Sequence, residues 1–540
     1  MRRLGLFWRT IRYLRLRQLV YQVINRLRSR ARLRLPASVP TSYFLTVPQA
    51  DKPITYVNRT FTFLNQPVSF PGSIDWNYSR NGKLWTYHLT YFDYLNQAEI
   101  DHRGGMTAEE GIDLLNQFID QTDAIQAGLE PYPTSLRITN WIHFLSRHQI
   151  TNKRVNAHLF AQTDLLNRRL EYHLAGNHLL ENGIALLTGA LYFQQRRWFD
   201  RASTLIRQEL TTQILADGAH DERSPMYHQL LLDRLLDLLT TLRANSWHVD
   251  LMLIAFVAEK QTMMLNWLNT ITFSNGDVPM VNDAAFNSAP TSVHIQAKAG
   301  RGLPSPTRRS AVAEGVGGIS SGYRLLRQPR YELFTDVGAV GPDHQPGHAH
   351  ADTFSFVLYV DAQPLLVDSG TSTYEPGPRR TWERSTAAHN TVEINGLNSS
   401  EVWGTFRVGR RASVTLLEES GDVLSAQHDG YSSLGIMHRR TWLLEERKIS
   451  VFDRVIAHKE TRSALISCVA RFYFHPGVLV VLEADTVIAG TVRLKFLSGM
   501  MPTVLLKPYD MAIGFNLLQG GQYLDVTFAD YLNTIVTITE

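Results

Sequence analysis

Three stretches of this sequence carry side chains that could do chemistry. The first contains Asn177 and His178 at the entry to a helix, and the second contains Tyr227 at the start of another. Imidazole and carboxylate groups are suited to binding zinc, and neutral histidine also serves as a general base. Such groups crowd the third stretch, which holds Asp343, His344, His348, His350 and Asp352, with Asp368 and His389 farther on.

Residue type and spacing alone leave a structural interpretation open for each stretch. Asn177 could cap the helix that it precedes, and Tyr227 could serve only in packing. The histidines could belong to a polar loop.

Helices are expected to position the first two stretches. Apolar residues recur at helical spacing from about residue 85 to 275, as in 180–191. Ser224 and Pro225 are typical of an N-cap and a first helical position, which places Tyr227 in the first turn. Because free backbone N–H groups create a positive potential there, we expect this position to favour the tyrosinate form modestly.

Strands are expected to position the third stretch. Residues 286–318 form a break rich in Ala, Ser, Pro and Gly, after which apolar residues alternate with smaller or polar ones, as at Phe354, Phe356 and Leu358. Residues 36–75 are interpreted as extended chain or loop. Helices first and strands afterwards predict an all-α domain followed by an all-β domain.

Length, composition and charge bound the class of protein. The chain has 540 residues, 44% of them hydrophobic, which is enough for about two to four domains with sizeable cores. Its single cysteine, Cys468, excludes an intrachain disulfide and a zinc site built from cysteines. Residues 1–35 hold 11 arginines and no acid, so the net charge of +4 leaves −7 for the rest. The sequence therefore does not predict a nucleic-acid-binding surface, and no nucleic acid is expected as a partner.

Residues 1–35, the N-terminal arm, are expected to form a basic amphipathic helix. Its apolar stripe consists of Leu4, Phe7, Trp8, Ile11 and Leu14. Arginines interrupt every apolar run that could serve as the core of a cleavable signal, and no run approaches the roughly 18 apolar residues of a membrane span. Two interpretations stay open: peripheral contact with an anionic membrane surface or partner, and packing on the protein's own body with solvated arginines.

Taken in order, the motifs resemble the heparinase II/III family of polysaccharide lyases. The helical part contributes LWTYHLTYFDYL, EPYPTSLRITNWIHFL, GNHLLENGIALLTGALYF and SPMYHQLLLDRLLDLL; the strand part contributes GHAHADTFSFVLYVDAQPLLVDSGTSTY, AAHNTVEINGLNSSEVWGTFRVG, HRRTWLL and ARFYFHP. The resemblance implies an α+β multidomain fold, with an incomplete (α/α) toroid at 36–300 and an antiparallel β-sandwich at 316–540 after the arm. His348-x-His350-x-Asp352 also resembles the start of the metallo-β-lactamase motif, but position 353 is Thr where that motif continues with histidine.

The resemblance implies a carbon–oxygen lyase that cleaves a uronate-containing acidic polysaccharide by β-elimination. This reaction needs a neutralised carboxylate, a base for the C5 proton and an acid for the O4 leaving group. By resemblance, Asn177, together with His178, neutralises the carboxylate. Tyr227 matches the catalytic tyrosine, which acts as acid and, in syn elimination, also as base. His348 matches the catalytic histidine, which serves as base for the opposite epimer or orients the sugar in a cleft between the domains.

The resemblance also implies a metal site and sugar-binding residues. The family's metal ligands, usually for zinc, correspond to His350, Asp368 and His389, a set whose chemistry suits zinc with a water as fourth ligand. This zinc is expected to organise loops beside the cleft. A family-like segment holds three residues that either shape sugar subsites or pack inside the toroid: Arg137, Asn140 and Trp141.

More than one interpretation stays open for the location of the protein and for its function. Family resemblance implies the cell envelope or periplasm, but secreted members carry a cleavable signal, so a cytoplasmic, inner-membrane-associated location is the alternative. The competing function is a catalytically weak polysaccharide-binding or assembly protein of envelope or exopolysaccharide production. A hydrolytic zinc enzyme is a third interpretation. The sequence does not fix which polysaccharide is bound.

Overall fold

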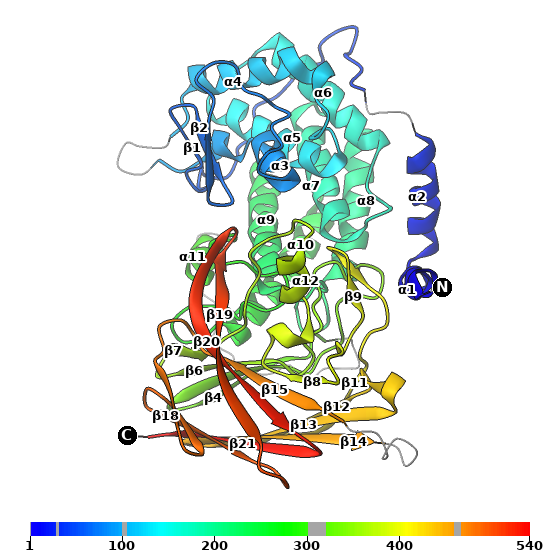
Figure 1. Cartoon of the computed structure of the whole chain (residues 1–540). Coiled ribbons are helices and arrows are strands. Elements are labelled where there is room, and N and C mark those ends of the chain that lie inside the picture. Colours follow the sequence, from blue (N-terminus) through cyan, green and yellow to red (C-terminus); the bar gives the residue numbers. More distant parts are fainter. Residues whose placement is uncertain (1, 29–31, 100–104, 301–319, 458–465, 540) are drawn as a thin grey trace.

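The structure, a computed structural model, describes residues 2–28, 32–99, 105–300, 320–457 and 466–539. Its first part is helical and its second part is built from strands, the upper and lower regions of Figure 1. The predicted order of helices before strands is therefore confirmed. The helices are α1 (Arg2–Ile11), α2 (Leu16–Leu27), α3 (Lys83–Tyr91), α4 (Ala108–Gln121), α5 (Pro131–Arg147), α6 (Lys153–Arg168), α7 (Gly176–Tyr192), α8 (Arg196–Gln213), α9 (Pro225–Ala244), α10 (Leu251–Ile271), α11 (Ser292–Gly300) and α12 (Pro378–Glu383).

Helices α7 and α9 lie in the core of the helical part, and their first turns carry predicted site residues. In α7, every residue except Asn177 and His178 is buried. In α9, the Ser224 hydroxyl accepts the backbone N–H of Tyr227 at 3.4 Å, and Pro225 takes the first helical position. The predicted start of this helix is confirmed, because a capping hydroxyl and a proline together satisfy the free end of the backbone.

The strands form three larger antiparallel sheets in the second part of the chain. Eight strands pair in the order β11 (Val414–Ser420), β12 (Val423–His428), β13 (Ile436–Glu445), β14 (Lys448–Ala457), β21 (Tyr531–Ile538), β18 (Val492–Leu497), β17 (Thr486–Ala489), β16 (Val480–Glu483). Four pair as β19 (Thr503–Gly514), β20 (Leu517–Phe528), β15 (Cys468–Tyr473), β8 (Val392–Ile394), and four as β4 (Tyr323–Gln328), β5 (Tyr331–Asp336), β6 (Phe356–Val360), β7 (Gln363–Leu366). A short ribbon joins β9 (Val402–Trp403) to β10 (Arg407–Val408).

Strand β6 joins the cores of the two parts. All five of its residues are buried, because neither face of the strand meets solvent. Phe356 and Leu358 belong to the core between the sheets, whereas Val357 and Tyr359 pack with Trp267 and other residues of the α10 region. Since side chains alternate between the faces of a strand, β6 lies between the β-core and α10. The helical and strand parts therefore share an apolar interface.

Two segments refine the sequence-based expectations. Residues 36–75 contain a small sheet of β1 (Tyr56–Val57), β2 (Thr60–Phe63) and β3 (Gln66–Ser69). The break expected at 286–318 contains α11, so it is not all loop; residues 301–319 lie outside the described residues. Cys468 is buried in β15, and burial raises its pKa to about 12. No helix in the described part of the chain combines the length and apolar composition that a bilayer crossing requires.

Candidate active site

The four residues predicted to be catalytic come from both parts of the fold. Asn177 and His178 lie in the first turn of α7, Tyr227 lies in the first turn of α9, and His348 lies in the loop between β5 and β6. The rings of Tyr227 and His348 are 4.0 Å apart. All four side chains are partly exposed, whereas the groups that hold them are buried. We call this group the candidate site.

Glu222, which the sequence does not predict, links the start of α7 to His348. Its Oε1 accepts the backbone N–H of Asn177 at 3.3 Å, and its buried Oε2 lies 3.6 Å from His348 Nε2 without a hydrogen-bond partner. Gly176 adopts φ 61°, and a Cβ there would lie 2.9 Å from Glu222 Oε1. Glycine therefore lets the carboxylate approach the N-terminus of α7, where the helix potential stabilises a negative charge.

Asp283 is a buried carboxylate that orients His348 and was also missed from the sequence. Its Oδ2 bonds His348 Nδ1 at 2.9 Å, and its Oδ1 bonds His350 Nε2 at 2.9 Å. Arg380 donates to both oxygens, at 2.7 Å for Nη2 to Oδ2. Burial opposes ionisation, but Arg380 and the two histidines hold the pKa of Asp283 well below its usual range. The bond to Nδ1 fixes the imidazole ring and leaves Nε2 as the nitrogen that Asp283 does not bind.

Tyr227 is a neutral phenol in this environment. Burial, the adjacent Tyr374, and the carboxylates of Asp283 and Glu222 raise the pKa of Tyr227 well above its ordinary value. Its Oη lies 3.1 Å from Tyr374 Oη. The expectation that the helix N-terminus favours tyrosinate is therefore wrong, because burial and nearby negative charge outweigh the helix potential. A neutral phenol is suited to donate a proton.

His178 lies against an aromatic ring and a carboxylate. Its ring stacks on Tyr132 with centroids 4.2 Å apart, and its Nδ1 lies 3.5 Å from Glu171 Oε1. Burial disfavours the imidazolium, but Glu171, followed by Glu222 and Glu181, outweighs burial and raises the pKa of His178. The environment therefore supports a positive charge beside Asn177.

Two of the three predicted metal ligands are hydrogen-bonded to each other, and the ring of the third lies beside one of them. His389 Nδ1 bonds Asp368 Oδ2 at 2.7 Å, and the rings of His350 and His389 are 5.3 Å apart. His350 Nδ1 and His389 Nε2 are buried without a hydrogen-bond partner, as is Asp352 Oδ2. Unpaired buried nitrogens of this kind are costly unless a further group binds them. The donor types and the unpaired nitrogens suit zinc, although within the described residues the ligand atoms of His350, Asp368 and His389 do not all lie within 4.8 Å of one another. The hydrogen bond to Nδ1 also lets Asp368 orient His389.

Within the described part of the chain, the three potential metal-binding residues whose ligand atoms do lie within 4.8 Å of one another are Asp51, Asp233 and His294. Lys298 Nζ already lies 3.3 Å from Asp51 Oδ2 and 2.5 Å from Asp233 Oδ1. Lys52 Nζ lies 3.3 Å from the other oxygen of Asp233. Both carboxylates are thus neutralised by lysine, and a metal ion would have to displace Lys298. These residues are better explained as an ion-pair cluster.

The residues predicted to shape sugar subsites are buried in α5. Arg137 and Trp141 are 0% exposed and Asn140 is 1% exposed. Arg137 donates to Gln162, to the carbonyl of Thr90 in α3 and to that of Gly128, at 2.8 Å for Gly128. Asn140 donates to the carbonyl of Tyr91. These side chains have no exposed surface with which to contact a sugar, so the packing alternative accounts for their positions.

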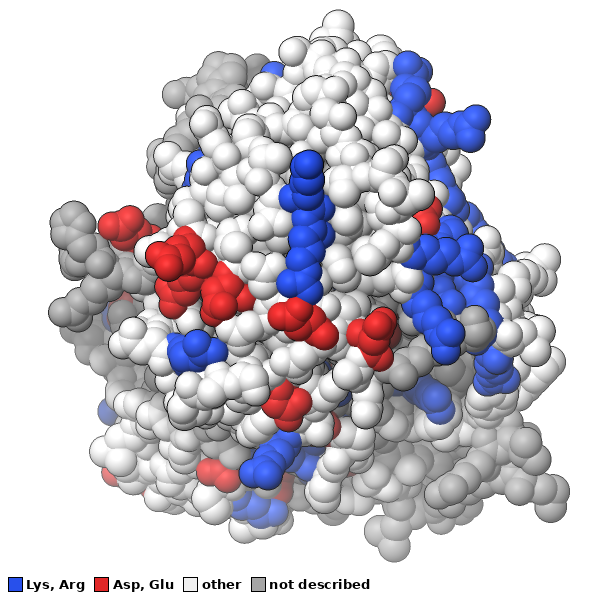
Figure 2. Space-filling model, turned by 90° about the horizontal axis from the view of Figure 1, so that it is seen from above, with Lys and Arg blue, Asp and Glu red and all other residues white. Residues whose placement is uncertain are grey.

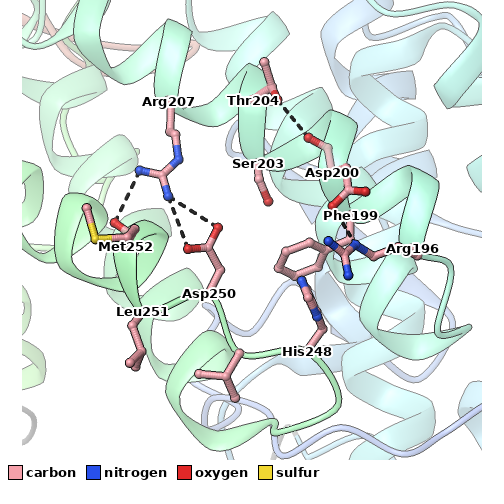
Figure 3. Close-up of a pocket in the computed structure, with 11 residues that line it drawn as sticks. Arg196, Phe199, Asp200, Ser203, Thr204, Arg207, His248, Asp250, Leu251 and Met252 are labelled. Carbon is pink, nitrogen blue, oxygen red and sulfur yellow. Dashed lines mark hydrogen bonds and ion pairs between the residues drawn. The ribbon is translucent and has the colours of Figure 1, made fainter.

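A pocket of about 560 Å³ opens elsewhere, between α8 and the start of α10 (Figure 3). None of the predicted site residues lines it. Within it, Arg207 pairs with Asp250 at 3.3 Å, and Arg196 pairs with Asp200 at 2.7 Å. The charged groups of the pocket thus neutralise one another, and it offers no catalytic constellation.

His228, next to Tyr227, is expected to make the fold sensitive to acid. Its Nε2 bonds the Met264 carbonyl at 2.9 Å and its Nδ1 accepts the N–H of His220 at 3.2 Å, so the neutral ring satisfies both nitrogens. Burial lowers the pKa of His228 to about 3. In the unfolded chain His228 is protonated below about pH 6.5, whereas in the folded chain it stays neutral until about pH 3. The contribution of neutral His228 to the free energy of unfolding is therefore complete above about pH 6.5 and is lost as the pH falls toward 3.

Urea unfolding at a series of pH values checks this expectation. The loss of unfolding free energy between about pH 6.5 and 4 should be smaller in His228→Gln, whose amide does not titrate there. Parallel pH profiles for the two proteins would show that His228 does not contribute.

Comparison with known protein families agrees with the geometry. Residues 133–299 match the family described as Heparinase II/III N-terminus, and residues 313–501 match the one described as Heparinase II/III-like, C-terminal. The chain belongs to the heparinase II/III-like family.

The relatives include a heparin-sulfate lyase of Bacteroides stercoris, which is 21% identical over 389 residues. The match takes in 68% of this chain and 54% of the relative, so the chain spans about half the length of that protein. Among solved structures, one of heparinase III is 16% identical with a TM-score of 0.69, covering 96% of this chain and 89% of the other. The structure of a mutant of the heparan sulfate lyase HepC from Pedobacter heparinus is also 16% identical and has a TM-score of 0.60. That match covers 89% of this chain and 81% of the other. The fold is therefore heparinase III-like.

Proposed function

We propose that this protein is a polysaccharide lyase that cleaves a uronate-containing acidic polysaccharide by β-elimination. The observation that carries the proposal is the meeting of Tyr227 and His348, with rings 4.0 Å apart, from two different parts of the fold. Glu222 connects this pair to Asn177. Membership of the heparinase II/III-like family supports the same chemistry.

In the proposed reaction, the chain's own residues supply each requirement. The Asn177 amide and the His178 imidazolium bind the uronate carboxylate, which stabilises the negative charge that develops when the C5 proton leaves. His348 Nε2 takes this proton, because Asp283 holds the other ring nitrogen. Neutral Tyr227 donates its proton to O4 as the C4–O4 bond breaks. The product carries a C4=C5 double bond conjugated with the carboxyl group. For the opposite C5 epimer, Tyr227 would have to act as base as well.

A screen of acidic polysaccharides for a rise in near-UV absorbance tests the proposal. At least one uronate-containing polymer should give the rise. Size-exclusion of the products and an assay of reducing ends run on the same samples. New reducing ends without absorbance would indicate hydrolysis instead, and binding without either signal would indicate the polysaccharide-binding or assembly function.

We also propose that zinc binds at His350, Asp368 and His389. The buried, unpaired nitrogens of both histidines support the site. When bound, zinc would hold these loops of the strand part together beside His348. We expect about one zinc per chain by elemental analysis, and a lower melting temperature after chelation. A His350→Ala/His389→Ala variant should lose the metal, whereas His475→Ala, a partly exposed histidine, should keep it. Equal zinc contents would place the metal elsewhere.

Finer points of architecture and location belong to the same proposal. We assign the incomplete (α/α) toroid to 36–300 and the antiparallel β-sandwich to 316–540, supported by α3–α11 in the first range and β4–β21 in the second. An experimental structure of the chain tests this division. We place the protein at the cell envelope or in the periplasm, on family resemblance. Recovery in the soluble cytosolic fraction after cell fractionation would contradict this location.

A further inference from the structure

The N-terminal arm is attached to the body through one face of its helices. Gln18, only 2% exposed, donates from Nε2 to the carbonyls of Leu174 and His344, at 3.3 and 3.1 Å. The ring of Tyr21 lies 4.7 Å from that of Tyr172. In α1, Arg9 forms a two-pronged pair with Glu401, at 2.7 and 2.8 Å. The interpretation that the arm packs on the protein's own body therefore holds for this inner face.

The opposite face of α2 presents apolar side chains to solvent. Leu16, Val20, Val23 and Leu27 are 76, 45, 57 and 82% exposed. Their spacing of four, three and four residues places them on one stripe of the helix. Trp8 in α1 is also 67% exposed. A surface helix normally buries its apolar stripe, so a stripe that faces outward marks a surface for interaction.

Arginines surround this stripe, and no acid accompanies them. Arg12, Arg15, Arg17 and Arg26 are exposed, and within the described residues none of them forms an ion pair with an acid. Residues 1–35 contain no aspartate or glutamate at all. Figure 2 shows blue side chains, with a few red ones among them, on the side of the molecule where α2 lies in Figure 1. The Arg17 guanidinium lies 3.6 Å from the ring centroid of Tyr172, and Arg15 and Arg17 interact electrostatically with the buried Glu209. The outer face thus combines apolar side chains with positive charge that the body compensates only in part.

We propose that the outer face of α1 and α2 binds an anionic lipid bilayer. The apolar stripe would enter the boundary between headgroups and acyl chains, and the arginines would contact lipid phosphates. A nucleic acid could pair its phosphates with the arginines but could not bury the apolar stripe. An anionic bilayer can do both. Because the inner face holds the arm on the body, binding does not require the arm to detach. The folded enzyme would lie on the membrane with α2 underneath.

Co-sedimentation of the full chain with vesicles tests this proposal without using lyase activity. The vesicles contain phosphatidylcholine alone or with about 30% phosphatidylglycerol, at low and high salt. We expect at least tenfold tighter binding to the anionic vesicles, weakened by salt because exposed charges are screened. Leu16→Glu/Val23→Glu should reduce this binding at least tenfold, and Arg15→Gln/Arg26→Gln should reduce it several-fold.

A matched control carries the same chemical change away from the arm. Leu479 and Val481 in the strand part are 78 and 41% exposed, so Leu479→Glu/Val481→Glu should bind vesicles like the unchanged chain. Circular dichroism and melting temperature establish that each variant is folded. Equal binding by the arm variant and the control would overturn the proposal. So would a dimer, seen by light scattering, that Leu16→Glu/Val23→Glu dissociates while vesicle binding is absent, because the stripe would then join two copies of the chain.

Discussion

Tyr227→Phe is expected to lower turnover by about 10²–10⁴-fold, the usual range for loss of a general acid or base. The substitution removes the hydroxyl that would protonate O4 but keeps the ring, which packs 4.0 Å from the ring of His348. The fold and the affinity for the polymer should therefore change little. The measurement is the initial rate of near-UV absorbance increase on the polymer identified by the screen, with kcat and KM determined separately.

Two other tyrosines separate the role of Tyr227 from general effects of losing a hydroxyl. Tyr374 Oη lies 3.1 Å from Tyr227 Oη, so Tyr374→Phe should have a smaller effect, exerted by changing the hydrogen bonding of Tyr227. Tyr43 is 43% exposed, and Tyr43→Phe should leave turnover unchanged. If folded Tyr227→Phe keeps the turnover of the unchanged enzyme, the proposed roles are wrong. If Tyr374→Phe loses more than Tyr227→Phe, Tyr374 is the proton donor.

Asp283→Ala is expected to destabilise the fold by about 3–5 kcal/mol, the cost of leaving a buried charge without its partner. Arg380, whose side chain is 1% exposed, would lose both of its bonds to the carboxylate. The rings of His348 and His350 would lose their acceptor at the same time. The free energy of unfolding in urea checks the expected loss.

Asp485→Ala is the control for Asp283→Ala. Asp485 also pairs with a basic residue, Lys495 at 3.6 Å, but the two side chains are 67 and 53% exposed. Because water already solvates such a pair, its removal should hardly change stability. Asp283→Asn provides a second variant if Asp283→Ala does not fold. It keeps the shape and part of the hydrogen bonding, so it should be intermediate in stability and still impair turnover through His348. Stability equal to that of Asp485→Ala would contradict a central role for Asp283.

Local signals in the sequence predicted the elements well. Ser224 and Pro225 gave the start of α9, because a cap and a first-turn proline act within a few residues of each other. The change from helical to alternating spacing gave the order of the two parts. Helix α11 was missed because it is short and lies in a stretch rich in Ser, Pro and Gly. A helix of this kind is stabilised mainly by packing on its neighbours, which the sequence does not show.

The candidate site was predictable only where a family motif marks it. Glu222 and Asp283 occupy segments without a motif, and their contacts join residues 45 to 126 positions apart. The sequence shows only that an acidic residue, Glu222, stands five positions before Tyr227; its burial and contacts come from the fold. The pKa of Tyr227 was misjudged for a related reason. The helix potential is a local property that sequence reveals, whereas burial and the charges of Asp283 and Glu222 depend on the folded chain.

The two hydrogen bonds of Gln18 have a thermodynamic consequence. The Gln18 amide donates to the carbonyl of Leu174, three residues before Asn177, and to the carbonyl of His344, four residues before His348. It therefore bridges the two parts of the fold beside the candidate site. Any separation of these segments that admits a polymer must break one of the bonds or shift the arm. If the polymer enters by separating these segments, arm position and polymer binding are linked equilibria. If binding to a lipid surface changes the affinity for the polymer by some factor, then binding of the polymer changes the affinity for the lipid surface by the same factor.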